Sequence, residues 1–213
     1  MRLARLGANA DVSCPCADIG CLNDETWADP AANSKGNCMN GTRDAFLAIA
    51  RYRSHTRDIV VEVLREAGDA IMAQPGAIPG GHGDGSIFAA LFHLVDVEES
   101  WLHEGLLAEG WQEGPDPGRY SDFEAIAAIW AQTSADWIAY FETRDDMALW
   151  APFTNRDDPP IPCWMVGWHA FNHTTHHLAE IWTALTVVGI SPPDLGPLRW
   201  ATQQPWSLDD QRT

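Results

Sequence analysis

Four stretches of this sequence repeat apolar residues at intervals of three and four, and this period constrains the fold more than any other feature. The stretches cover about residues 42–73, 86–110, 121–143 and 162–188. Such spacing places the apolar side chains on one face of an α-helix, which must then pack against another apolar surface. No stretch alternates convincingly in the manner of a β-strand. The pattern therefore predicts an all-α protein with four long helices that pack as an antiparallel bundle.

Segments rich in glycine and proline separate the four predicted helices. Residues 75–85 contain five Gly and two Pro, and residues 114–118 contain two further Pro. Gly and Pro both interrupt helices, so we expect loops at these two places. Residues 144–162 contain four Pro, and we expect an irregular connection there.

Residues that commonly cap helices stand at the predicted ends. Gly68 is a weak point within the first helix, and Gly110 and Gly189 are expected to end the second and fourth helices. The predicted N-caps are Thr42, Ser86, and either Ser121 or Asp122.

The helical pattern leaves a segment at each end of the chain, so we expect the domain to span residues 41–190. Residues 1–40 show no sustained period and are expected to form a flexible tail, with Met39 as an alternative start. Residues 191–213 are rich in Pro and polar residues and are expected to form a second tail without a long helix. The N-terminal tail holds four cysteines that lack zinc-site spacing and are expected to be thiols: Cys14, Cys16, Cys21 and Cys38.

The formal net charge of −17 limits the partners of this chain. An acidic surface repels the phosphates of nucleic acids and of anionic lipids, so we expect neither a nucleic acid nor a membrane as a partner. No stretch reaches the roughly 20 apolar residues that span a bilayer, and no apolar run of a secretory signal follows Met1. We therefore expect a cytoplasmic protein.

Four of the eight histidines lie close together in the last predicted helix. His169, His173 and His177 follow one another at intervals of four residues, so they share one stripe, and His176 points away from it. Imidazoles at positions i and i+4 are near enough to bind one metal ion. Helical geometry alone leaves two pairs open, because His173 can act with His169 or with His177.

His93 lies on the apolar stripe of the second predicted helix and can supply a third imidazole from a facing helix. Three neutral imidazoles would leave positions on the ion open for water or substrate, as in catalytic sites. The alternative is a set of histidines that pack in the core without a metal.

Four carboxylates lie near these histidines in the sequence. Asp96, Glu98 and Glu99 form a charge cluster that we interpret as a solvated face. Glu180 follows His177 by about one turn. It is a candidate general base, a partner that fixes a histidine tautomer, or an ion-pair residue.

Two segments of the sequence resemble the DinB/YfiT-like metalloenzymes. The second predicted helix reads LFHLVDVEESWL over residues 91–102, and the fourth reads NHTTHHLAEI over residues 172–181. The resemblance covers about residues 42–190 and implies an up-down-down-up four-helix bundle that is often a homodimer. It assigns a metal-binding triad to His93, His173 and His177, and it leaves His169 and His176 out of the ligand set.

The resemblance also implies a function. Characterised relatives are similar to thiol-dependent S-transferases and isomerases that use zinc, nickel or a similar divalent ion with bacillithiol, mycothiol or glutathione. We therefore predict a metal-dependent enzyme that acts on small electrophiles, with Glu180 as a candidate catalytic residue where the family usually has Gln. The alternatives are a hydrolase that uses metal-activated water and a metal-binding, stress-associated protein without turnover.

Overall fold

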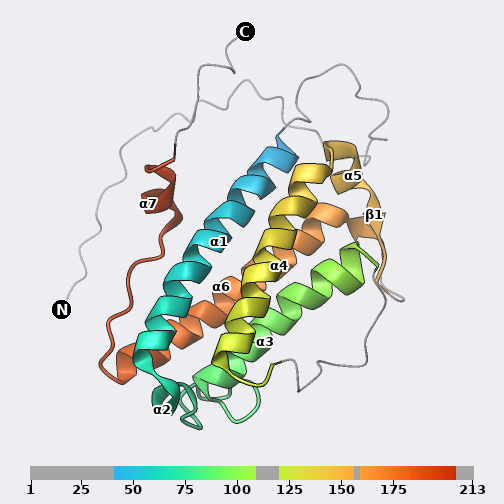
Figure 1. Ribbon diagram of the computed structural model, residues 1–213. Coiled ribbons are helices and arrows are strands. Elements are labelled where there is room, and N and C mark those ends of the chain that lie inside the picture. Colours follow the sequence, from blue (N-terminus) through green and yellow to red (C-terminus); the bar gives the residue numbers. More distant parts are fainter. Residues whose placement is uncertain (1–40, 109–119, 156–158, 205–213) are drawn as a thin grey trace, which may run out of the picture. The chain divides into compact units, whose positions relative to one another are not determined.

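The computed structural model describes residues 41–108, 120–155 and 159–204, and this part of the chain is mostly helical (Figure 1). The all-α prediction is confirmed. The four predicted helices correspond to α1 (Thr42–Ala67), α3 (Ile87–Ser100), α4 (Phe123–Thr143) and α6 (Cys163–Val187). The predicted N-terminal tail, with its four cysteines and Met39, lies outside the described residues. Among the described helices, none is both long and apolar enough to cross a membrane.

The helix ends follow the capping residues closely. Ser86 and Asp122 each accept a hydrogen bond from the backbone amide three residues later, so both predicted N-caps are confirmed. The prediction for Thr42 is wrong by one residue, because Gly41 is the N-cap of α1. Gly68 adopts a φ of 81° and separates α1 from the short helix α2 (Asp69–Met72). Gly189, with a φ of 87°, follows the last residues of α6.

The second long helix changes its hydrogen bonding near its end. A π-helix, η2, covers Trp101–Leu106 directly after α3, and the Leu107 amide donates to the carbonyl of Leu102, five residues earlier, at 2.8 Å. Ala108 then adopts a φ of 53°, in the left-handed region that ends a helix. The prediction that this helix reaches Gly110 is therefore wrong, because regular structure ends at residue 106.

The segment expected to be irregular between α4 and α6 contains three short elements. Helix α5 (Asp146–Trp150) is capped by the Asp145 carboxylate, which accepts from the Ala148 amide at 2.8 Å. Strand β1 (Pro152–Phe153) pairs antiparallel with β2 (Ile161–Pro162). Two-residue strands are too short to show alternation in a sequence. The C-terminal segment contains only the short helix α7 (Pro197–Ala201) among its described residues, as expected.

Side-chain contacts give the direction in which neighbouring long helices run. Along α1 and α4 the partners progress in opposite order, from Phe46 with Phe141 to Arg65 with Glu124. The order along the second long helix and α6 is also opposite. His93 of α3 lies beside His173, whereas Trp101, which follows α3, lies beside His169, nearer the start of α6. Figure 1 shows these four helices side by side.

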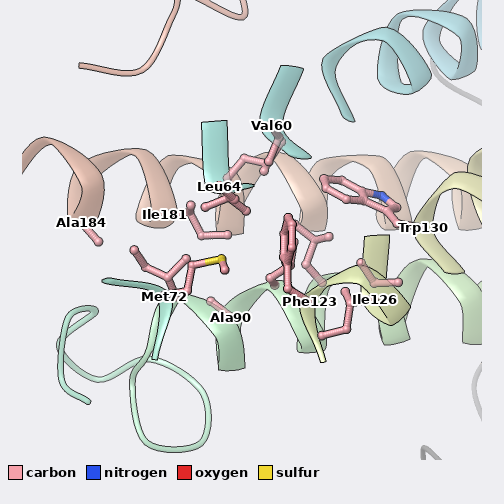
Figure 2. Close-up of a cluster of buried hydrophobic side chains, with 14 of the residues drawn as sticks. Val60, Leu64, Met72, Ala90, Phe123, Ile126, Trp130, Ile181 and Ala184 are labelled. Carbon is pink, nitrogen blue, oxygen red and sulfur yellow. The ribbon is translucent and has the colours of Figure 1, made fainter. Parts of the chain in front are cut away.

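Apolar side chains from all four long helices form the core. Figure 2 shows one cluster, in which Val60 and Leu64 of α1 face Ile126 and Trp130 of α4 and Ile181 of α6. A second cluster joins the opposite halves of α1, α4 and α6. Its largest members are Phe46, Trp137, Tyr140, Phe141 and Phe171.

A charged layer lies between the two apolar clusters. The Glu98 side chain is buried and accepts hydrogen bonds from Arg53 at 3.2 Å, from the Trp130 indole at 2.9 Å and from the Thr174 hydroxyl. These residues come from α1, α3, α4 and α6. The Trp137 indole also donates to the Glu98 carbonyl, at 3.3 Å. The four long helices therefore meet at one carboxylate.

The position of Glu98 corrects the interpretation of the charge cluster as a solvated face. Asp96 and Glu99 are half-buried, and Glu99 accepts a hydrogen bond from the Tyr120 hydroxyl. Glu98 instead points inward, because Arg53 lies on the apolar stripe of α1 and provides an opposite charge. A buried carboxylate requires such a partner.

Candidate metal centre

Three of the predicted histidines converge where α3 faces α6. His93 occupies the second turn of α3, and His173 and His177 lie one turn apart on α6. The Nε2 atom of His173 is 3.1 Å from Nε2 of His93 and 3.2 Å from Nε2 of His177. The structure thus places Nε2 of His173 close to Nε2 of each of the other two histidines.

The surroundings keep these imidazoles neutral. Burial, together with the neighbouring imidazoles, lowers the pKa of His93 and of His173 to about 4. Burial also lowers the pKa of His177, against the opposing effect of Glu180. A neutral imidazole has a lone pair on one ring nitrogen, which is the form that binds a metal.

Glu180 fixes the orientation of His177. Its Oε2 atom lies 2.7 Å from Nδ1 of His177, and its Oε1 atom lies 3.3 Å from Nε2 of His176. A carboxylate can only accept, so Nδ1 of His177 carries the proton and its Nε2 lone pair faces the other two imidazoles. Carboxylates commonly hold metal-binding histidines in this way. Of the three roles considered for Glu180, the geometry favours the partner that fixes a tautomer.

The two short distances at His173 fit nitrogens that share a divalent cation. Nitrogens held at about 2.0–2.1 Å from a tetrahedral ion lie about 3.3–3.4 Å apart. The observed distances of 3.1 and 3.2 Å are close to this value. The Nδ1 atom of His173 is buried without a hydrogen-bond partner among the described residues. The Nε2 atom of His173 instead faces the Nε2 atoms of His93 and His177. A cation bound there would offset the repulsion between nitrogen lone pairs.

The other two histidines of α6 lie outside this group. His169 is exposed, and its ring centroid is 5.1 Å from Trp101 and 6.2 Å from His173. The centroids of His173 and His177 are 4.4 Å apart. Of the two pairs that helical spacing leaves open, the structure brings together the ring nitrogens of His173 and His177.

A fourth histidine reaches the site from the loop between α2 and α3. The His82 ring stacks on His93 with centroids 3.5 Å apart, and its centroid is 5.0 Å from that of His177. One nitrogen from each of these three residues lies within 4.8 Å of the others. His82 was not predicted from the sequence, because residues 75–85 were interpreted only as a break between helices. The flanking Gly81 and Gly83 were the available signal, since glycine permits close approach of a backbone.

The sequence profile of the DinB family matches residues 39–207. The match covers all four long helices and the four histidines of the site. No protein of curated function matches the chain.

Proposed function

Because the chain belongs to the DinB family, we propose that it is a divalent-metal-dependent enzyme that joins a low-molecular-weight thiol to a small electrophile or isomerises such a substrate. The observation that carries this proposal is the convergence of three neutral imidazoles, one from α3 and two from α6. We propose His93, His173 and His177 as the ligands and zinc or nickel as the ion.

The ligand set supports a reactive centre more than a structural one. Three imidazoles leave at least one position for an exogenous group on a four-coordinate ion. A bound divalent ion would lower the pKa of a coordinated thiol and so supply a thiolate at neutral pH. In this proposal the three histidines hold the ion, and Glu180 is a positioning residue that keeps His177 in the required tautomer.

Aromatic side chains beside the triad support an apolar electrophile as the second substrate. The Trp101 ring packs edge-on against His169 and lies 6.3 Å from Phe153. Both contacts place apolar surface on the side of the site toward the start of α6. Such surface binds aromatic or alkyl groups through burial.

We also propose that the four long helices form the up-down-down-up bundle implied by the resemblance. The opposite order of contacts between α1 and α4, and between α3 and α6, supports this topology. The chain from Leu107 to Asp122 is long enough to return along the length of α3 and η2, about 30 Å, so that α4 can start beside the start of α3. The homodimer and the cytoplasmic location stay predictions from the sequence.

The enzymatic proposal is tested by turnover with and without metal and thiol. Zinc-loaded and nickel-loaded protein would be incubated with bacillithiol, mycothiol or glutathione and a panel of halogenated aromatics and epoxides. We expect product only when metal, thiol and electrophile are all present, with chelator-treated protein as the control. Turnover of esters or amides without any thiol would favour the hydrolase, and metal binding without turnover in any panel would favour a non-catalytic protein.

Replacing Glu180 tests its role as a positioning residue. A glutamine can still accept the proton of His177 Nδ1, whereas an alanine cannot. We expect Glu180→Ala to weaken metal binding by about 10- to 100-fold and Glu180→Gln to weaken it less. Chelator competition measures both affinities. Equal affinities of the Glu180→Ala variant and the parent would show that His177 needs no support from this carboxylate.

A further inference from the structure

We infer that His82 is a fourth, exchangeable ligand of the ion held by the triad, supplied by the loop between α2 and α3. This inference rests on the proposed function, because it concerns the same ion. His82 would occupy the solvent-facing position on the ion and give way to an incoming thiol.

The loop that carries His82 has a defined backbone. The amides of Gly76 and Ile78 donate to the carbonyls of Asp84 and Gly85 at 2.9 and 2.8 Å, and these two bonds join the limbs of the loop. The Gly85 amide donates to the carbonyl of His82 at 2.8 Å and closes a four-residue turn. The Ile78 side chain is buried in the core cluster of Figure 2 and anchors the loop.

Glycine brings the tip of this loop against α3. Gly83 adopts a φ of 58°, and a Cβ atom there would lie 3.2 Å from the Cβ atom of Ala89. A larger residue would be strained in this conformation and would crowd the first turn of α3. The close approach places the His82 ring on the His93 ring.

The distances allow His82 to share the ion after a small rotation of its side chain. Two nitrogens bound to one tetrahedral ion at about 2.0–2.1 Å lie about 3.3–3.4 Å apart, so the His82 nitrogen must move closer to the others. One nitrogen each of His82, His93 and His177 lies within 4.8 Å of the others. The hydrogen-bonded loop keeps the backbone in place, so rotation about the side-chain bonds suffices for both binding and release.

Exposure separates His82 from the other three imidazoles. His177 is buried, and His93 and His173 are half-buried, whereas His82 is exposed. A ligand on the solvent side can leave the ion without disturbing the core. Four imidazoles saturate a tetrahedral ion, as in structural sites, and release of one reopens it. The arrangement thus protects the ion until a competing ligand arrives.

Cobalt(II) titration of the full chain tests this inference, because four-coordinate cobalt(II) absorbs visible light more strongly than five- or six-coordinate cobalt(II). For the parent we expect a strong four-coordinate spectrum. For His82→Ala we expect a shifted spectrum, because water would take the place of one imidazole nitrogen, and an affinity for cobalt(II) about 10- to 100-fold lower. The matched control is His55→Ala, which removes an exposed histidine of α1 and should reproduce the parent spectrum.

A second readout uses 2-mercaptoethanol as a simple thiol added to cobalt-saturated protein. Half-saturation of the sulfur-to-cobalt absorption should occur at a lower thiol concentration in His82→Ala, because no imidazole competes. Circular dichroism of the metal-free variant checks that the fold is retained. Identical cobalt spectra and thiol titrations for parent and His82→Ala would overturn the inference and leave the triad intact. A parent that binds no cobalt(II) would overturn the proposed function itself.

Discussion

Purified His173→Ala protein should contain no more metal than a chelator-treated sample, and its affinity for zinc should be at least about 100-fold below that of the parent. The reason is the central place of His173, whose Nε2 atom lies 3.1 Å from that of His93 and 3.2 Å from that of His177. Its loss removes the nitrogen common to both close pairs. Elemental analysis gives the stoichiometry, and chelator competition gives the affinity.

The matched control for this variant lies one turn earlier on the same helix. His169→Ala removes an imidazole of the same stripe, but the exposed His169 ring packs against Trp101. We expect its metal content to equal that of the parent. Loss of metal in His169→Ala with retention in His173→Ala would contradict the ligand assignment. Circular dichroism of both variants without metal separates a lost ligand from a lost fold.

Glu98→Ala should lower the free energy of unfolding by about 3–5 kcal/mol, the usual effect of removing one partner of a buried ion pair. Glu98 is 3% exposed, and the side chain of Arg53 is 10% exposed. Without the carboxylate, the Arg53 charge stays buried, and the Trp130 indole and the Thr174 hydroxyl lose an acceptor. Urea unfolding of metal-free protein at neutral pH measures the change.

Two further variants separate the buried pair from charge effects in general. Arg65 and Glu124 form an exposed pair at 2.9 Å, so Glu124→Ala should lower the free energy of unfolding far less than Glu98→Ala does. The double variant Arg53→Met with Glu98→Leu removes both charges and should recover most of the stability lost in Glu98→Ala. If the free energy of unfolding of Glu98→Ala lies within about 1 kcal/mol of that of the parent, the charged layer does not hold the helices together.

The long helices were predictable because each has a strong local signal. The apolar period, with the capping residues Ser86 and Asp122 for α3 and α4, predicted the ends of α3 with η2, of α4 and of α6 to within a few residues. The short elements between α4 and α6 were not, because a five-residue helix and two-residue strands depend on their tertiary neighbours. The inward direction of the Glu98 side chain could not be predicted from the sequence either, because it depends on Arg53 of another helix.

The candidate site was also only partly predictable from the sequence. His173 and His177 share a helix, so their spacing alone brings them within reach of one ion. His93 needed the packing of α3 on α6, and the structure supplies it. His82 lies eleven residues before His93 in a glycine-rich segment that shows no period. The position of His82 depends on the turn at Gly83 and on the burial of Ile78. Neither feature can be predicted from the sequence, because both depend on how the loop packs on the helices.

The π-helix after α3 bears on the ancestry of this chain. A turn closed by a bond between residues five apart holds one more residue than an α-helical turn. Such a turn absorbs a one-residue insertion at the end of the helix while Ile87–Ser100 keeps its packing. A positional alignment of this chain with relatives that lack the π-helix should therefore open a one-residue gap within Trp101–Leu106.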